Sequence, residues 1–292
     1  MDSQTLTQIL GGRWHRRYGT APCPACQPER RRDQTALTLT DGANGRLLAH
    51  CKKSGCAFHD IMAAAGVSAG EYRAPDPATI ARRNAETKAN AKRKSLQAER
   101  CWNEATPIIG TPAERYLRGR GITCDLPLKL RYHPNCWHSS GKRYSAMVAR
   151  IEGVSGYAVH RTYLRANGTD KAELRPNKAM LGATAGGAVR LIAAPGPLVV
   201  AEGIETALSL ASGMLGRPAT IWAALSTSGM RGLRLPPSPG RLTVATDGDD
   251  PGRAAGHDLA ERAHALGWNV SLLPAPDGCD WCDVLSGKAV MV

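Results

Sequence analysis

The pattern of apolar and polar positions changes along the chain and predicts a different structure in each part. From Pro197 onward, short apolar runs alternate with longer segments of helical periodicity. We expect strands over Leu198–Ala201, Thr220–Leu225, Arg241–Thr246 and Trp268–Leu273, and helices over Glu205–Met214 and Gly252–Leu266. Such regular alternation of strands and helices is typical of a parallel α/β sheet.

Two short alternating runs mark the first 70 residues, which are otherwise rich in turn-forming residues. Ala36–Thr40 and Arg46–His50 are joined by Asp41-Gly42-Ala43-Asn44-Gly45, and a glycine-containing connection between two such runs predicts a β-hairpin. Asp60–Ala65 predicts a short helix. We therefore expect a small β-ribbon in this part of the chain.

The middle of the chain begins with a helical pattern and continues with strands. The stretch from Pro77 to about Ala105 contains neither Gly nor Pro after its first residue, which predicts a long, exposed helix. Pro112–Arg118 predicts a second helix, with Thr111 as its N-cap. Ser145–Ile151 and Gly156–Leu164 predict a strand hairpin in a mixed sheet.

These changes of pattern divide the chain into four parts. They are a cysteine-bearing ribbon at 1–70, a basic helical linker at 71–105, a basic mixed α/β subdomain at 106–190 and a parallel α/β domain at 191–292. The expected fold class is α/β, or α+β for the chain as a whole.

Composition narrows the class of protein. The chain has 292 residues, of which 42% are apolar and 22% charged, and this composition excludes an entirely disordered protein. Uncharged stretches such as Pro218–Met230 are shorter than the roughly 18 residues of a membrane-spanning helix, and Met1–Leu10 lacks a basic-then-apolar leader. We expect a soluble, cytoplasmic protein that has no membrane partner.

The net charge of +13 is distributed unevenly. Residues 1–100 contain 17 basic and 9 acidic residues, residues 101–190 contain 14 and 6, and residues 191–292 contain 7 and 10. A basic body joined to an acidic domain suits an enzyme that acts on a polyanion, because Lys and Arg bind phosphates while clustered carboxylates bind metal ions.

Four of the nine cysteines flank the predicted hairpin as two local pairs, Cys23 with Cys26 and Cys51 with Cys56. Thiolate pairs on a β-ribbon are typical of tetrahedral zinc sites, and a ribbon with so little apolar sequence needs such a cross-link to fold. We expect one structural Zn²⁺ held by all four sulfurs. Because the second pair has four intervening residues, His50 or His59 is an alternative ligand.

The other five cysteines are assigned no metal. Cys101, Cys124 and Cys136 are far apart in the sequence and are expected to be small core residues. Cys279 and Cys282 form a close pair but have no second pair to complete a site.

Acidic residues follow three of the predicted strands in the C-terminal domain. Glu202 follows the first strand, Asp247 and Asp249 follow the third, and Asp280 follows the last. Because open α/β sheets bind ligands at the carboxyl ends of their strands, we expect these side chains to converge. Clustered carboxylates repel one another unless a cation lies between them, and oxygen ligands without histidine favour Mg²⁺ or Mn²⁺.

One neighbouring acid has a second interpretation. Asp250 precedes Pro251-Gly252 at the start of a predicted helix and can serve as its N-cap. We therefore assign metal binding to Glu202, Asp247 and Asp249 as a group, with Asp280 as a further magnesium ligand.

At this point the sequence resembles a known family. Glu202-Gly203-Ile204-Glu205-Thr206, Asp247-Gly248-Asp249 and Asp280-x-x-Asp283 resemble the Toprim domain of bacterial-type primases, topoisomerases and some nucleases. The cysteine ribbon resembles the zinc-binding domain of those primases, and ribbon, basic segment and Toprim follow one another in the primase order. The likeness spans most of the chain, is closest to the compact primases of phages, plasmids and integrated elements, and implies that Glu202, Asp247 and Asp249 are catalytic.

The resemblance extends to the middle of the chain. Gly156–Leu164, Lys171 and Lys178 resemble the basic subdomain that contacts template and incoming nucleotide in primases. This implies template or nucleotide binding by Arg161, Lys171 and Lys178. One departure is Thr206, which stands where bacterial replicative primases usually carry Asp.

The resemblance implies a DNA primase that makes short RNA primers on single-stranded DNA from nucleoside triphosphates, in phage, plasmid or mobile-element replication. No G-x₄-G-K-[ST] motif occurs, so we expect a separate replicative helicase as partner. Two alternatives are a non-catalytic, zinc-dependent single-strand binder that assists replication and a Toprim nuclease that cuts DNA without triphosphates.

Overall fold

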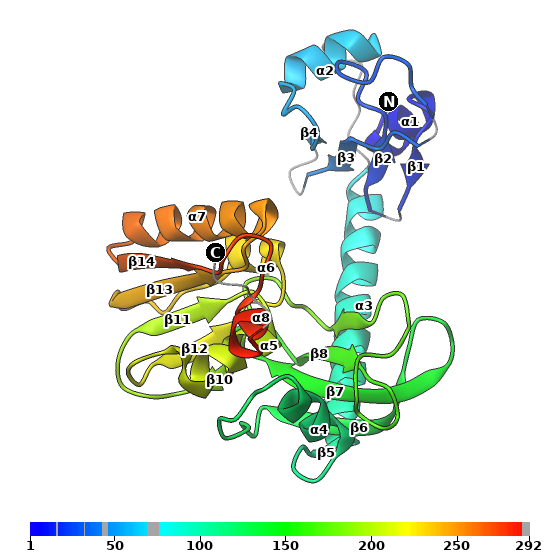
Figure 1. The fold of residues 1–292 in the computed structure, drawn as a ribbon. Coiled ribbons are helices and arrows are strands. Elements are labelled where there is room, and N and C mark those ends of the chain that lie inside the picture. The colour runs from blue at the N-terminus through cyan, green and yellow to red at the C-terminus, as the bar shows by residue number, and fades with distance from the viewer. Residues whose placement is uncertain (16, 32, 43–45, 69–75, 288–292) are drawn as a thin grey trace. The chain divides into compact units, whose positions relative to one another are not determined.

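The computed structural model describes residues 1–15, 17–31, 33–42, 46–68 and 76–287. The chain forms two compact units, Met1–Asn90 and Ala91–Val292. Helix α3 (Pro77–Asn103) begins in the first unit and ends in the second (Figure 1). Among the described residues, no helix combines the length and the apolar character that crossing a bilayer requires.

The first unit is built on an antiparallel sheet in the order β1-β2-β3-β4. The strands are β1 (Arg13–Trp14), β2 (Gly19–Ala21), β3 (Leu37–Asp41) and β4 (Leu47–Cys51), and the helices are α1 (Ser3–Ile9) and α2 (Phe58–Ala65). The pairing of β3 with β4 confirms the predicted hairpin, and α2 confirms the predicted short helix. Positions 43–45 of the hairpin connection lie outside the described residues.

The apolar core of this unit is small, and two of the four ribbon cysteines belong to it. Cys23 and Cys51 are buried together with Leu6, Leu37 and Ile61. A unit of this size buries little apolar surface, so a metal cross-link between its cysteines would contribute directly to its stability.

Helix α3 confirms the long helix predicted from the composition of this segment. Most of it is exposed, but Ala98, Cys101 and Trp102 are buried near its C-terminal end. These positions are three and four residues apart and lie on one helical face, which packs against the sheet of the middle segment. This end of the helix is thus part of the second unit.

The middle segment forms a five-stranded sheet in the order β5-β6-β7-β8-β9. Its strands are β5 (Thr106–Pro107), β6 (Leu130–Trp137), β7 (Arg143–Ile151), β8 (Ala158–Tyr163) and β9 (Lys178–Leu181). All their pairings are antiparallel, where the sequence predicted a mixed sheet, and each strand pairs with the next strand along the chain. Helix α4 (Pro112–Gly119) begins as predicted, with Thr111 as its N-cap.

Both faces of strand β8 are buried, and the alternation of successive side chains between these faces determines where its polar residues lie. Val159 and Tyr163 pack on the α3 side of the sheet. Arg161 lies between them in the sequence and therefore shares that face. His160 and Thr162 point to the opposite face, which the C-terminal segment covers.

The C-terminal segment forms a second five-stranded sheet in the order β10-β12-β11-β13-β14. Its strands are β10 (Val189–Ile192), β11 (Leu198–Ala201), β12 (Thr220–Ala223), β13 (Arg241–Thr246) and β14 (Asn269–Pro274). The four strands that the sequence predicted are parallel, and β10 adds an antiparallel edge that the sequence did not predict. The α/β fold class is confirmed.

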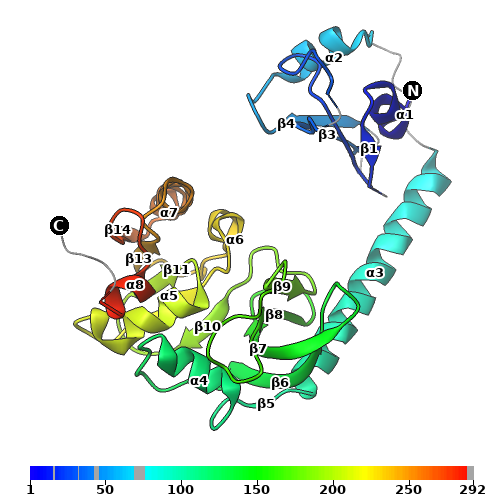
Figure 2. The same ribbon diagram turned by 45° about the vertical axis from the view of Figure 1, so that its right-hand side comes forward.

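Helices cover both faces of this sheet (Figures 1 and 2). They are α5 (Ile204–Ser209), which continues into the π turn η1 (Leu210–Met214), α6 (Thr227–Gly232), α7 (Asp250–Ala265) and α8 (Trp281–Leu285). Val199 packs on the α5 side, whereas Val200 packs on the α7 side. Burial on both faces explains why the central strands are continuous apolar runs.

Candidate functional site

Two neighbouring parallel strands position the first two carboxylates. Strands β11 and β13 pair directly, with Ala201 opposite Ala245. Glu202 is the first residue after β11, and Asp247 is the first residue after β13. Their side chains therefore lie at the same edge of the sheet, the carboxyl edge at which α/β sheets bind ligands.

Gly248 brings a third acidic loop to this edge. Its amide donates to the carbonyl of Cys279 at 2.8 Å, and the amide of Gly278 donates to the carbonyl of Gly248 at 3.0 Å. A Cβ atom at position 248 would collide with the carbonyl oxygen of Pro276, so this close approach requires glycine. The pairing fixes the loop that carries Asp280 beside Asp247.

The carboxylates repel one another, and this repulsion contributes to raised pKa values at two of them. Burial raises the pKa of Asp247 to about 7, and the charges of Glu202, Asp280 and Asp249 add to the effect. Burial and the charge of Asp249 likewise raise the pKa of Glu202, while the ammonium of Lys178 opposes the rise. It is therefore more favourable for this site to bind a cation than to hold several ionised carboxylates without a counter-ion.

Asp249 and Asp280 also serve as N-caps. The Oδ1 atom of Asp249 accepts from the amide of Gly252 at 2.8 Å at the start of α7, so the helix is capped by Asp249 and not by Asp250. Oδ1 of Asp280 accepts from the amides of Cys282 and Asp283 at 2.8 Å at the start of α8. Capping fixes both side chains in position and uses the same oxygen, Oδ1, of each carboxylate.

The donor set fits a hard divalent cation. All of its donor atoms are carboxylate oxygens. Within the described ranges, no three carboxylates each have an oxygen within 4.8 Å of an oxygen of the other two. Mg²⁺ commonly keeps several of its waters and takes only one or two protein carboxylates, so an open arrangement of this kind suits it. Glu202, Asp247 and Asp249 are the residues that would hold the ion, with Asp280 beside them.

Sequence reasoning did not assign a role to Glu205, which anchors the basic side of the site. Its side chain is 4% exposed. Oε1 accepts from the hydroxyl of Tyr116 at 2.8 Å, and Oε2 lies 3.1 Å from Nζ of Lys178, while Nζ of Lys171 lies 3.9 Å from Oε1. Although burial acts in the opposite direction, the two ammonium groups hold the pKa of Glu205 well below its usual value.

Two of the three predicted basic residues therefore lie beside Glu205, and one of them also lies near the carboxylate cluster. Lys178 is close enough to Glu202 to lower its pKa, and Lys171 shares Glu205 with Lys178. Thr206, which stands where primases usually have Asp, donates from its hydroxyl to Oδ1 of Asp247 at 3.4 Å. At this position the chain has a neutral hydrogen-bond donor in place of a further charge.

Arg161 lies elsewhere. Its face of β8 packs toward α3, and its Nη1 donates to the carbonyl of Trp137 at 3.0 Å. His160, on the face nearer to Glu205, has its pKa lowered to about 4 by burial and by the charge of Lys178, so it is neutral. The structure thus separates Arg161 from Lys171 and Lys178.

The ribbon cysteines meet as predicted. The four sulfurs of Cys23, Cys26, Cys51 and Cys56 lie within 4.8 Å of one another, and those of Cys26 and Cys51 are 3.5 Å apart. Burial acts against ionisation of Cys51, but the backbone amides that surround its sulfur lower its pKa to about 6. Neither alternative histidine belongs to this group of described residues, and the four-sulfur set fits tetrahedral zinc.

We predict that replacing Cys26 and Cys56 by Ser in the full chain lowers bound zinc by about one per chain and unfolds the first unit, because the metal supplies the stability that its small core lacks. Elemental analysis and circular dichroism measure the two effects. Cys124→Ser is the control, since Cys124 is half-buried outside any metal-binding group of the described residues. Unchanged zinc content in the double variant would contradict the assignment.

Asp247→Asn should stabilise the metal-free protein at alkaline pH. Asp247 has a raised pKa in the folded state, so its contribution to stability is present at low pH and is lost as the pH rises toward about 7. In chelator above that pH, the free energy of unfolding of the variant should exceed that of the parent by up to about 2 kcal/mol. This is roughly half of the free energy that corresponds to the full pKa shift, because solvent screens a partly exposed group. The gain should vanish below about pH 4.

Urea unfolding across the pH range measures this difference. Asp125→Asn, at an exposed position, is the matched control and should change stability little. A variant at position 247 that is less stable than the parent at alkaline pH would show that the carboxylates do not repel one another.

Glu205→Gln should destabilise the second unit by about 3 kcal/mol at neutral pH, because it leaves two ammonium groups beside a buried neutral amide. The control is Glu173→Gln, which removes an exposed ion pair with Arg165 and should cost less than about 1 kcal/mol. Chemical denaturation followed by circular dichroism compares them. Equal, small losses in the two variants would refute the anchoring role of Glu205.

Comparison with known structures gives four matching chains, and three of them are primase structures. A DNA primase domain from Pseudomonas aeruginosa is 20% identical, with 67% of this chain and 75% of that chain covered and a TM-score of 0.43. The zinc-binding and RNA polymerase domains of the Aquifex aeolicus primase are 14% identical, with 97% and 79% covered and a TM-score of 0.41. The RNA polymerase domain of Mycobacterium tuberculosis primase DnaG is 17% identical, with 68% and 78% covered and a TM-score of 0.40.

Comparison with sequences places the carboxylate site in a known domain. No curated protein sequence matches the chain. Residues 92–191, which include α4 and the middle sheet, match a domain of unknown function, DUF7146. Residues 197–289, which include Glu202, Asp247 and Asp280, match the Toprim domain. The C-terminal third of this chain is therefore a Toprim domain.

Proposed function

We propose that the protein is a DNA primase, which synthesises short RNA primers on single-stranded DNA by metal-dependent nucleotidyl transfer. The observation that carries this proposal is the position of Lys178 near Glu202 of the Toprim domain, with Lys171 beside it on Glu205. Cationic side chains next to a metal-binding carboxylate cluster are what a nucleoside triphosphate requires, because its phosphates need both charge neutralisation and fixed orientation.

The proposed reaction transfers a nucleotide. A primer 3′-hydroxyl attacks the α-phosphorus of a nucleoside triphosphate, the new P–O bond forms, and pyrophosphate leaves. Bound Mg²⁺ or Mn²⁺ would lower the pKa of the attacking hydroxyl and neutralise the charge that grows on the phosphoryl oxygens.

The residues of the chain have distinct parts in this proposal. Glu202, Asp247 and Asp249 provide carboxylate oxygens at one edge of the Toprim sheet. Glu202 is also a candidate for proton transfer, because its pKa is raised. Lys171 and Lys178 orient the triphosphate, and both are held in place by Glu205. Arg161 lies on the other face of the middle sheet and is not part of this proposed site.

The first unit would bind the template. Its zinc ribbon belongs to the basic part of the chain, and positive charge attracts the phosphates of single-stranded DNA. The order of ribbon, basic segment and Toprim domain is that of primases, and the proposal extends to replication of a phage, plasmid or other mobile element together with a separate helicase.

The test uses purified full-length protein, a single-stranded DNA template, labelled ribonucleotides and Mg²⁺ or Mn²⁺. The parent protein should make short RNA. Asp247→Asn should reduce product at least about 100-fold, because it removes a ligand of the catalytic metal, while template affinity stays equal or rises as negative charge is lost. Asp125→Asn should behave like the parent.

Three outcomes would reject this proposal. Template cleavage in Mg²⁺ without triphosphates, abolished by Asp247→Asn, would identify a nuclease. Tight template binding by the parent with no RNA product would identify a single-strand binding protein. Product formation that is unaffected by Asp247→Asn would place catalysis outside the carboxylate site.

A further inference from the structure

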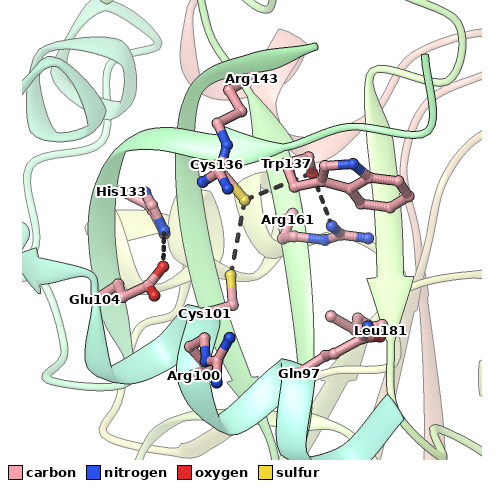
Figure 3. A pocket seen from close by; sticks show the side chains of 10 residues that line it. All are labelled: Gln97, Arg100, Cys101, Glu104, His133, Cys136, Trp137, Arg143, Arg161 and Leu181. Carbon is pink, nitrogen blue, oxygen red and sulfur yellow. Dashed lines mark hydrogen bonds and ion pairs between the residues drawn. The ribbon is translucent and has the colours of Figure 1, made fainter. Parts of the chain in front are cut away.

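A second group of metal-ligating side chains lies in the middle segment, outside the Toprim site and the ribbon. Cys101 comes from the last turn of α3, and His133 and Cys136 come from β6. Figure 3 shows the two sulfurs facing each other across the junction between helix and sheet, with the imidazole of His133 beside them. Sequence analysis treated both cysteines as ordinary core residues.

The distances in this group match a tetrahedral metal site. The sulfurs of Cys101 and Cys136 are 3.7 Å apart. One ring nitrogen of His133 and both sulfurs lie within 4.8 Å of one another. Two thiolates that bind the same Zn²⁺ at about 2.3 Å, with tetrahedral angles, are separated by about 3.8 Å. The sulfurs therefore already have the separation that a shared metal ion imposes.

Both ring nitrogens of His133 have hydrogen-bond partners, and Nδ1, which accepts from the amide of Asn135 at 3.1 Å, must give up this contact to bind a metal while Nε2 stays beside a carboxylate. Nε2 of His133 lies 3.2 Å from Oε2 of Glu104, the residue that follows α3. A carboxylate that contacts a ligating imidazole fixes its orientation and raises its basicity. Glu104 is half exposed, at the rim of a cavity of about 310 Å³ that the three ligands also line, so a fourth ligand can enter.

A buried positive charge lies beside the two cysteines, although burial itself opposes the ionisation of their thiols. Cys136 is 1% exposed, and Cys101 is 9% exposed. Arg161 is itself buried against the cavity, and its Nε has no hydrogen-bond partner among the described residues. A buried cation beside two thiols stabilises their ionised, metal-binding form.

We propose that Cys101, His133 and Cys136 bind a second thiophilic divalent metal ion, of which Zn²⁺ is the natural candidate, separate from the ion of the ribbon. Soft sulfur ligands combined with imidazole select zinc over Mg²⁺. The ion ties the C-terminal end of α3 to β6 and thereby fixes this helix on the middle sheet. The site does not depend on the proposed primase activity, because none of its ligands belongs to the carboxylate cluster.

The test is the metal content of the full chain, purified under reducing conditions and loaded with Zn²⁺ alone. The parent should hold about two Zn²⁺ per chain. The pair of changes Cys101→Ser and Cys136→Ser should leave about one, the pair Cys26→Ser and Cys56→Ser should also leave about one, and Cys124→Ser should leave about two. Glu104→Gln, at a half-exposed position, should keep the fold and weaken the second site by about 10- to 100-fold.

A mutation-free measurement guards against variants that fail to fold. Alkylation of the Zn²⁺-loaded parent followed by mass spectrometry should find Cys101 and Cys136 protected, and addition of chelator should expose them. One zinc ion per parent chain, or two retained after loss of Cys101 and Cys136, would overturn the proposal. A disulfide between these two cysteines in the Zn²⁺-loaded parent would overturn it as well.

Discussion

Electrostatic repulsion between carboxylates is the constraint on which the rest of the C-terminal structure depends. Strand pairing brings Glu202 and Asp247 to the same edge, and the Gly248 turn adds Asp280, so the fold concentrates negative charge where the sheet is open. Burial increases this effect and raises the pKa of Asp247 to about 7. A protein gives up stability in this way where it needs a site for cations.

Glu205 holds two lysine side chains near this cluster and keeps them from pairing with its carboxylates. Lys178 and Lys171 are both paired with Glu205, which is buried and also accepts from Tyr116. The lysines come from the middle segment and the glutamate from the Toprim domain, so the ion pairs join the two sheets of the second unit. Lys171 and Lys178 therefore pair with Glu205 and not with Glu202 or Asp247.

The sequence predicted the elements better than it predicted the contacts between them. The parallel strands and the four-sulfur group could be read from apolar periodicity and from local cysteine spacing, which are properties of short segments. Arg161, by contrast, was assigned together with Lys171 and Lys178 because this segment resembles the basic subdomain of primases, and strand alternation places it on the opposite face. Cys101 and Cys136, 35 residues apart, meet only because α3 packs on β6, and no spacing rule contains that information.

The central claim is that Asp247 lies among carboxylates that together hold a divalent cation. The most direct measurement is the titration of its side-chain carboxyl by ¹³C NMR, with and without Mg²⁺. The account predicts a midpoint near 7 in chelator and a fall of more than about 1 pH unit with saturating Mg²⁺, since a bound cation favours the ionised form. A midpoint near 4 that Mg²⁺ does not change would contradict it.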